Sequence, residues 1–171
     1  MAIVRAPAGY TGMQIVLHWI IAGLVIFQVI FGEEIKPAYR AARRAAEASA
    51  QDLFNANIHV YIGSTILLLA LWRLFLRLRH GIPMLPENEN AILKWIAIAT
   101  HGVLYFVIFA MPVTGMVAWF GGINAAGEIH ELGKPVIVVF VAIHAAGALW
   151  QHFFVRNGVL VRMLKPEHNR D

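Results

Sequence analysis

The sequence predicts an all-α integral membrane protein, a four-helix transmembrane bundle with both termini in the cytoplasm. The chain has 171 residues, of which 59% are hydrophobic and only 14% are charged. Its mean hydropathy is +0.64, and short polar segments separate four long apolar runs. Soluble domains of ordinary composition carry about 25% charged residues. The composition therefore excludes an ordinary water-soluble enzyme and favours a small bundle that lies in lipid.

The apolar runs are long enough to cross a hydrocarbon layer about 30 Å thick as helices. The first run has His18 and Gln28 as its strongly polar interruptions. The second ends with Arg73 and Arg77, whose long stems can carry their charges back to the lipid headgroups. The third contains Pro112, where a kink is expected. We expect one domain over residues 1–171, with helices over about residues 13–32, 57–79, 91–120 and 128–156.

The orientation follows from lysine and arginine, because cytoplasmic loops carry an excess of these residues. Nine of them lie in the N-terminus, the second loop and the C-terminus: Arg5, Arg73, Arg77, Arg79, Lys94, Arg156, Arg162, Lys165 and Arg170. The first and third loops hold five, namely Lys36, Arg40, Arg43, Arg44 and Lys134, and six acids, namely Glu33, Glu34, Glu47, Asp52, Glu128 and Glu131. Both termini should therefore be cytoplasmic. The Ala-rich first loop, about residues 32–57, should carry a short helix on the outer surface.

The chain contains no cysteine. Disulfides, thiolate metal sites, iron–sulfur clusters and covalently attached c-type haem are thereby excluded, because each needs a sulfur atom. Any metal would be held by histidine, and eight histidines are many for so apolar a chain. The net charge of +4 does not indicate nucleic acid as a partner, because the basic residues flank the apolar runs and form no separate basic domain.

The spacing of two histidines suggests two metal centres. His130 and His144 are 14 residues apart, so on a helix they lie on nearly the same face, about 21 Å apart along the axis. The expected topology places His18 on the cytoplasmic half and His59 on the outer half. Depth in the membrane therefore pairs His18 with His144, and His59 with His130. Two imidazoles from facing helices suit the axial positions of non-covalent haem b, which needs nothing that this chain lacks.

These residues also carry a resemblance to the prokaryotic cytochrome b561 family, which is similar to the cytochrome b subunits of nickel–iron hydrogenases and formate dehydrogenases. The resemblance extends from Tyr10 to about Lys165. It is carried mainly by the segments Leu17-His18-Trp19, His59-Val60-Tyr61-Ile62-Gly63, His101 with Leu104-Tyr105, Pro112-Val113-Thr114-Gly115, Ile129-His130-Glu131 and Ile143-His144-Ala145-Ala146.

The resemblance implies a bundle in the bacterial cytoplasmic membrane that binds two haem b groups at His18, His59, His130 and His144. Family members of about this size resemble superoxide oxidases, in which electrons from periplasmic superoxide cross the membrane to ubiquinone. The chain is thus expected to be a superoxide:quinone oxidoreductase. A membrane anchor that takes electrons from a dehydrogenase or hydrogenase partner is one alternative. An ion transporter lined by histidine is another, although transport sites usually cluster near the bilayer midplane.

Further side chains have two open interpretations each. His152, Gln151 and His101 are candidate quinone contacts, or they form structural hydrogen bonds within the bundle. Glu131 or a backbone carbonyl is expected to accept the second ring proton of His130. A third set either steers an anion to the outer haem or forms the polar face of a surface helix: Arg40, Arg43, Arg44 and Lys134.

Overall fold

The computed structural model of the protein describes residues 7, 9–84 and 90–166. The long helices are α1 (Gly12–Phe31), α3 (Ala50–His80), α4 (Ala91–Gly121) and α5 (Asn124–Trp150). The short helices are η1 (Gly32–Ile35), α2 (Lys36–Arg43), the π-helical η2 (Gln151–Val155) and η3 (Val161–Met163). The described ranges contain no strand. Four helical segments in these ranges are long and apolar enough to span a membrane, which confirms the predicted all-α bundle of four membrane helices.

Two helices begin earlier than the apolar runs predicted. The helix α3 starts at Ala50 and not near residue 57, because Ser49 caps it and accepts a hydrogen bond from the backbone N–H of Asp52 at 3.1 Å. Its first turns are polar, so the hydropathy pattern did not reveal them. The helix α5 starts at Asn124 and not near residue 128. The connection before it is therefore much shorter than the expected loop.

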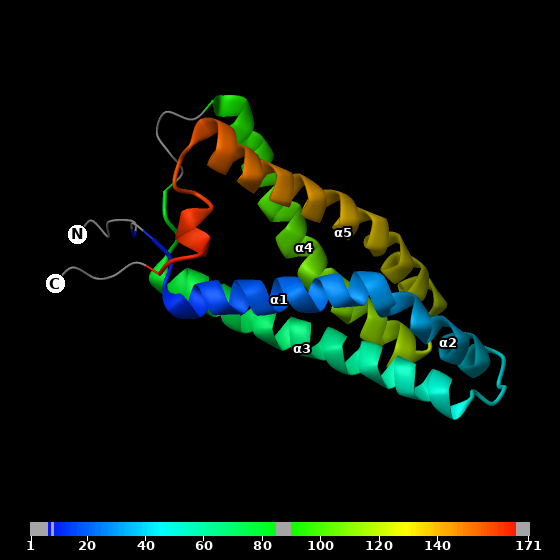
Figure 1. Ribbon diagram of the computed structural model, residues 1–171. Helices are drawn as coiled ribbons and strands as arrows, with labels where there is room; N and C mark the ends of the chain where they lie inside the picture. Colours follow the sequence, from blue (N-terminus) through cyan, green and yellow to red (C-terminus); the bar gives the residue numbers. More distant parts are fainter. Residues whose placement is uncertain (1–6, 8, 85–89, 167–171) are drawn as a thin grey trace.

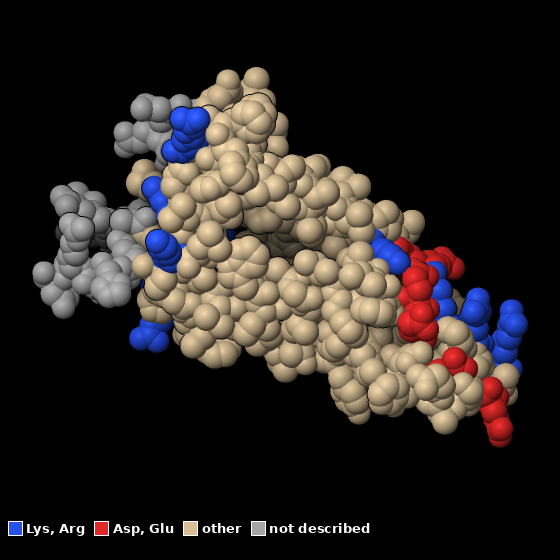
Figure 2. All heavy atoms as spheres, viewed as in Figure 1, with Lys and Arg blue, Asp and Glu red and all other residues tan. Residues whose placement is uncertain are grey.

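The long helices form an elongated bundle, with the start of α1 at one end and α2 at the other (Figure 1). The helix α1 packs against α3, α3 against α4 and α4 against α5, whereas α1 and α5 pack less closely. Between α1 and α5 lies a cavity of about 220 Å³ with an entirely apolar lining. Figure 2 shows the corresponding hollow on this face of the molecule. The bundle thus leaves a recess between α1 and α5 that its own side chains do not fill.

The outer surface of the bundle is apolar. Large side chains such as Leu68, Phe106 and Leu132 are exposed, Phe106 to 71%. In the four candidate spans at most 17% of the most apolar window is buried inside the protein. A protein with so much exposed apolar surface would aggregate in water, and this surface suits contact with lipid chains.

Charge divides between the two ends of the bundle. All acidic residues of the described ranges lie in η1, in the segment from α2 to the first turn of α3, or in the first turns of α5. In Figure 2 the acidic side chains gather at the α2 end, and the charged side chains of described residues at the opposite end are basic. The predicted cytoplasmic bases Arg5 and Arg170 lie outside the described residues.

Candidate functional site

The structure brings the four predicted ligand histidines together as two pairs. The ring centroids of His59 on α3 and His130 on α5 are 6.0 Å apart. Those of His18 on α1 and His144 on α5 are 6.1 Å apart. Both members on α5 belong to one uninterrupted α-helix. The pairs are those that depth in the membrane predicted, and each one joins side chains from two different helices.

Glycine makes room for the imidazoles of the His59–His130 pair. A Cβ atom at Gly115 would lie only 3.0 Å from Cε1 of His130. A Cβ atom at Gly32 would lie 3.3 Å from Cε1 of His59. Both distances are tighter than ordinary contacts of a Cβ atom. The absence of a side chain at these positions therefore lets each ring lie against a neighbouring backbone.

A backbone carbonyl orients His130. Its Nδ1 lies 2.8 Å from the carbonyl oxygen of Met111. Because a carbonyl oxygen only accepts, Nδ1 carries the proton and donates it, which leaves Nε2 with a free lone pair. Of the two acceptors that the sequence suggested, the structure shows the carbonyl, whereas Glu131 lies 4.0 Å from Nζ of Lys36. The spacing of residues could not single out Met111, because any residue has a carbonyl.

His59 is held from the other side of the bundle. Nε2 of Gln28 on α1 donates a hydrogen bond to the backbone oxygen of His59 at 2.8 Å. The ring atom Nδ1 of His59 is buried and has no hydrogen-bond partner among the described residues. Because buried polar atoms are normally hydrogen-bonded, one without a protein partner indicates that a ligand, a water molecule or a metal binds there. The sequence marked Gln28 as a polar interruption, and the structure supplies its role.

The His18–His144 pair has a third histidine and a cation beside it. The ring of His101 on α4 lies 5.0 Å from that of His144, and its Nδ1 lies 2.6 Å from the carbonyl oxygen of Ala97. The charge of Arg73 is close enough to interact electrostatically with His18 and His144. Within the described part of the chain, no group of three or more histidine, cysteine, aspartate or glutamate side chains is arranged to hold a metal ion by itself.

The donor set fits haem b. Zinc sites need three or four protein ligands, and each centre here offers two facing imidazoles. A haem needs only one or two, because the porphyrin supplies the other nitrogens. The unpartnered nitrogen of His59, the glycine-lined rings and the apolar cavity between α1 and α5 all suit a flat apolar cofactor.

The three predicted quinone contacts do not lie together. His101 is next to His144, as described above. Gln151 and His152 belong to η2, where the side chain of Gln151 accepts a hydrogen bond from Asn157 and the ring of His152 contacts Phe153 at 4.9 Å between centroids. Of the three candidates, His101 is thus the one that the structure places beside a histidine pair.

The sequence profile of the prokaryotic cytochrome b561 family matches residues 9–166. The chain belongs to this family. As a prokaryotic cytochrome b561 it is a haem-binding electron-transport protein of the membrane, and family membership implies haem of the b type.

The chain is similar to three relatives over nearly the whole length of both proteins. The chain is 36% identical to "Cytochrome b562" of Cereibacter sphaeroides, over 92% of this chain and 96% of the relative. It is 26% identical to "Probable superoxide oxidase CybB" of Yersinia pestis, over 91% and 95%. It is 23% identical to "Cytochrome b561 homolog 1" of Escherichia coli, over 91% and 96%.

Proposed function

We propose that this prokaryotic cytochrome b561 carries electrons across the bacterial cytoplasmic membrane with two haem b groups, held by His18 with His144 and by His59 with His130. One observation carries the proposal. Two histidine pairs form, each between two helices. The members on α5, His130 and His144, are 14 residues apart on this helix, which corresponds to about 21 Å along its axis. A single centre at one face would leave most of the lipid layer unbridged.

Each bound haem supplies an iron that gains and loses one electron. The chain would contribute two imidazole ligands to each haem, an apolar wall that excludes water, and nearby charges that set the two potentials. The Met111 carbonyl keeps the Nδ1 proton of His130 in place, which leaves the lone pair of Nε2 available as a ligand. The residues therefore position the cofactor and tune it, and the redox chemistry belongs to the haem.

The charge distribution supports one orientation. The excess of lysine and arginine at the end opposite α2 supports a cytoplasmic position of that end, with His18 and His144. The α2 end, with all acids of the described ranges, then faces the periplasm together with His59 and His130. Electrons entering at the α2 end would leave near His101, the candidate quinone contact that lies beside His144.

Superoxide is the proposed electron donor and ubiquinone the proposed acceptor. The name of the Yersinia pestis relative supports the donor, and the exposed Arg40 and Arg44 on the α2 end provide positive charge for an anion. Two superoxide ions would give up two electrons and become dioxygen. One ubiquinone would take up these two electrons together with two protons and become ubiquinol, so the reaction balances.

A protein donor is the second candidate, because the α2 end is not uniformly positive. Lys134 Nζ lies 2.7 Å from Glu33 Oε1, and Arg43 donates a hydrogen bond to the backbone oxygen of Gly122 at 3.0 Å. These bases are engaged within the chain and mixed with acids. A surface of mixed charge suits docking of a dehydrogenase or hydrogenase subunit better than steering of a small anion.

Two measurements on the purified protein test the proposal. A pyridine haemochrome assay should give two haem b per chain, and one or none would overturn the two-centre proposal. A colourless preparation made with adequate haem supply would favour an ion transporter. Stopped-flow mixing of the oxidised protein with superoxide should then reduce the haem well above the uncatalysed background. Two haems without such reduction would favour the protein donor.

A further inference from the structure

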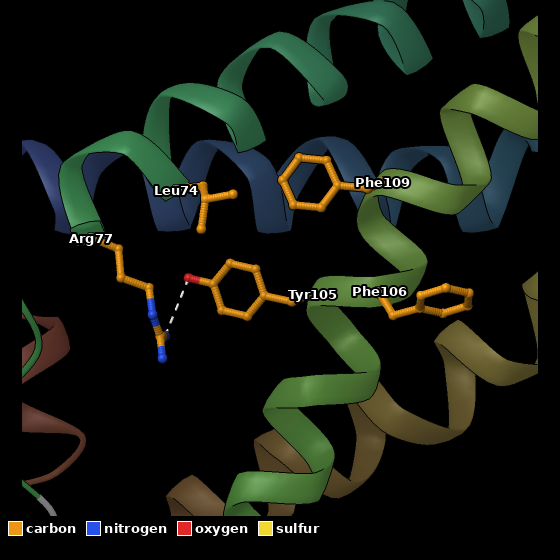
Figure 3. Close-up of a pocket in the computed structure, with 5 residues that line it drawn as sticks. All are labelled: Leu74, Arg77, Tyr105, Phe106 and Phe109. Atoms are coloured by element: carbon orange, nitrogen blue, oxygen red, sulfur yellow. Dashed lines mark hydrogen bonds between the residues drawn. The ribbon is translucent and has the colours of Figure 1, made fainter.

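Two arginines on α3 turn inward to one tyrosine on α4. Nη1 of Arg73 lies 3.1 Å from the hydroxyl oxygen of Tyr105, and Nη1 of Arg77 lies 3.4 Å from the same atom. Figure 3 shows Arg77 and Tyr105 pointing toward each other across the space between the two helices. The sequence suggested that both arginines carry their charges out to the headgroups. Instead, two like charges meet at a single hydroxyl group.

This cluster has no acidic partner within the described ranges. All ion pairs found there involve Glu33 or Glu131 at the opposite end of the bundle. Nε of Arg73 is buried and without a hydrogen-bond partner in the same ranges. Positive charge between membrane helices is costly unless an anion compensates it. Two guanidinium groups and an unpartnered buried donor are thus left, among the described residues, with positive charge that an anionic oxygen would compensate.

A second tyrosine lies close enough to the cluster for its charges to act on it. Tyr10 lies at the start of α1, and burial raises its pKa, while the charges of Arg73 and Arg77 lower it. The net direction is upward, so the phenol stays protonated near neutral pH. A protonated phenol can donate a hydrogen bond to an anionic oxygen.

The cavity beside the cluster is amphipathic. It has a volume of about 380 Å³ and is lined by Arg77 and Tyr105 at one end and by Leu74, Phe106 and Phe109 elsewhere. Figure 3 shows the ring of Phe109 pointing toward Leu74, whereas the ring of Phe106 points away from Arg77 and Tyr105. The lining suits a ligand with an anionic group and an apolar body.

We propose that Arg73, Arg77 and Tyr105 form a binding site for an oxyanion carried by an amphipathic molecule. The guanidinium groups supply charge and several N–H donors in a fixed planar arrangement, which matches a carboxylate or a phosphate. The ligand would enter between α3 and α4, with its anionic group against the arginines and its apolar part against the phenylalanines.

Two molecules present in a bacterial membrane carry this chemistry. One is a propionate group of the haem at the His18–His144 pair, because Tyr105 lies one turn beyond His101 on α4, and the ring of His101 lies 5.0 Å from that of His144; this source rests on the function proposed above. The other is the phosphate of an anionic phospholipid, which needs no haem. The experiment therefore has one arm for each source.

The test compares the purified holoprotein with Arg73→Gln, Arg77→Gln and Tyr105→Phe, and with Arg79→Gln as a matched control from the exposed end of the same helix. The first arm records the propionate bending bands in the resonance Raman spectrum. The second measures retention of phosphatidylglycerol, relative to phosphatidylcholine, by native mass spectrometry. Loss of a charge-assisted hydrogen bond should weaken retention about tenfold.

Each outcome decides the proposal. Shifted propionate bands in the cluster variants, with unchanged lipid retention, support the carboxylate source. Reduced phosphatidylglycerol retention with unchanged bands supports the phosphate source. If neither readout differs from that of Arg79→Gln, the oxyanion site is overturned. If the wild-type protein holds no haem, the two-haem proposal fails by itself and lipid retention alone decides the site. Tyr105→Phe keeps the ring and removes one hydroxyl, so it guards against variants that do not fold.

Discussion

The two histidine pairs lie in different surroundings. At the α2 end, His130 donates its Nδ1 proton to the Met111 carbonyl at 2.8 Å, and glycines lie against both rings of the pair. At the other end, His144 has His101 as a neighbour at 5.0 Å and interacts electrostatically with Arg73. One site is thus shaped by backbone groups, and the other by side chains that carry or can carry charge.

This difference implies a direction for electron flow. A hydrogen bond from Nδ1 to a carbonyl makes the imidazole a stronger donor to iron, which favours the oxidised state and lowers the reduction potential. A nearby positive charge such as that of Arg73 favours the reduced state and raises the potential. We therefore expect the haem at His59–His130 to have the lower potential. Electrons would then move downhill from the α2 end toward the end that holds His144.

The largest expected effect comes from removing one ligand of each pair. His130→Ala should abolish the low-potential haem and His144→Ala the high-potential one, because each leaves its iron with a single imidazole in an apolar site. Pyridine haemochrome and reduced-minus-oxidised spectra measure the haem that remains. We expect the haem content to fall from about two to about one in each variant.

Loss of both haems from each variant, in protein that circular dichroism shows to be helical, would contradict the independence of the two sites. Loss of neither would contradict the pairing. His80→Ala is the matched control, since its exposed Nδ1 lies 3.2 Å from the Leu76 carbonyl at the end of α3, and it should keep both haems.

Crowding one ring should separate the two sites without removing a ligand. Gly115→Ala would place a Cβ atom 3.0 Å from Cε1 and 3.1 Å from Nδ1 of His130, so the ring or the helix must shift. We expect partial loss or a spectral shift of the low-potential haem alone. Gly102→Ala on the same helix is the control, because a Cβ there meets nothing within 4 Å. Equal effects of the two substitutions would show that the approach of Gly115 to His130 has no role.

The contrast between the sites also marks what can be predicted from a sequence. Helical periodicity turned the spacing of His130 and His144 into one face of a helix, and the order of the spans then predicted their neighbours. Both inferences rest on regular geometry, and the structure brings the predicted pairs together. The role of the Met111 carbonyl could not be predicted from the sequence, because hydrogen bonding by a backbone group depends on which turn of α4 lies opposite His130. The inward turn of Arg73 was likewise hidden, since its long side chain reaches either the headgroups or Tyr105 from the same position.

A smaller effect should follow from strengthening the carbonyl hydrogen bond. Thr114 Oγ1 lies 2.7 Å from the Ala110 oxygen and 3.0 Å from the Met111 oxygen, so it shares its one proton between the two carbonyls and competes in part with His130 for the second. Thr114→Val removes this competitor at nearly constant volume. The low potential should fall further by about 20–40 mV, the equivalent of about 0.5–1 kcal/mol. Thr65→Val is the control in a redox titration, because Thr65 makes the same kind of bond, to Tyr61 at 2.8 Å, on an exposed face of α3.

The smallest effect concerns the charges that surround the entry to the low-potential site. Glu33 forms ion pairs with both Lys36 and Lys134, so Glu33→Gln removes one negative charge and releases two lysines. An anionic donor that enters at the α2 end should then reduce the haem faster, by about twofold at low ionic strength, and the gain should vanish as salt screens it. Stopped-flow reduction by superoxide across a salt series measures this, with Glu47→Gln as a control that removes the same charge from the exposed α2–α3 segment. An increase that is equal in both variants would reflect net charge alone. An increase confined to Glu33→Gln would locate the approach of the donor beside η1, where a Cβ atom at Gly32 would lie 3.3 Å from Cε1 of His59, and a decrease would contradict anion entry at this end.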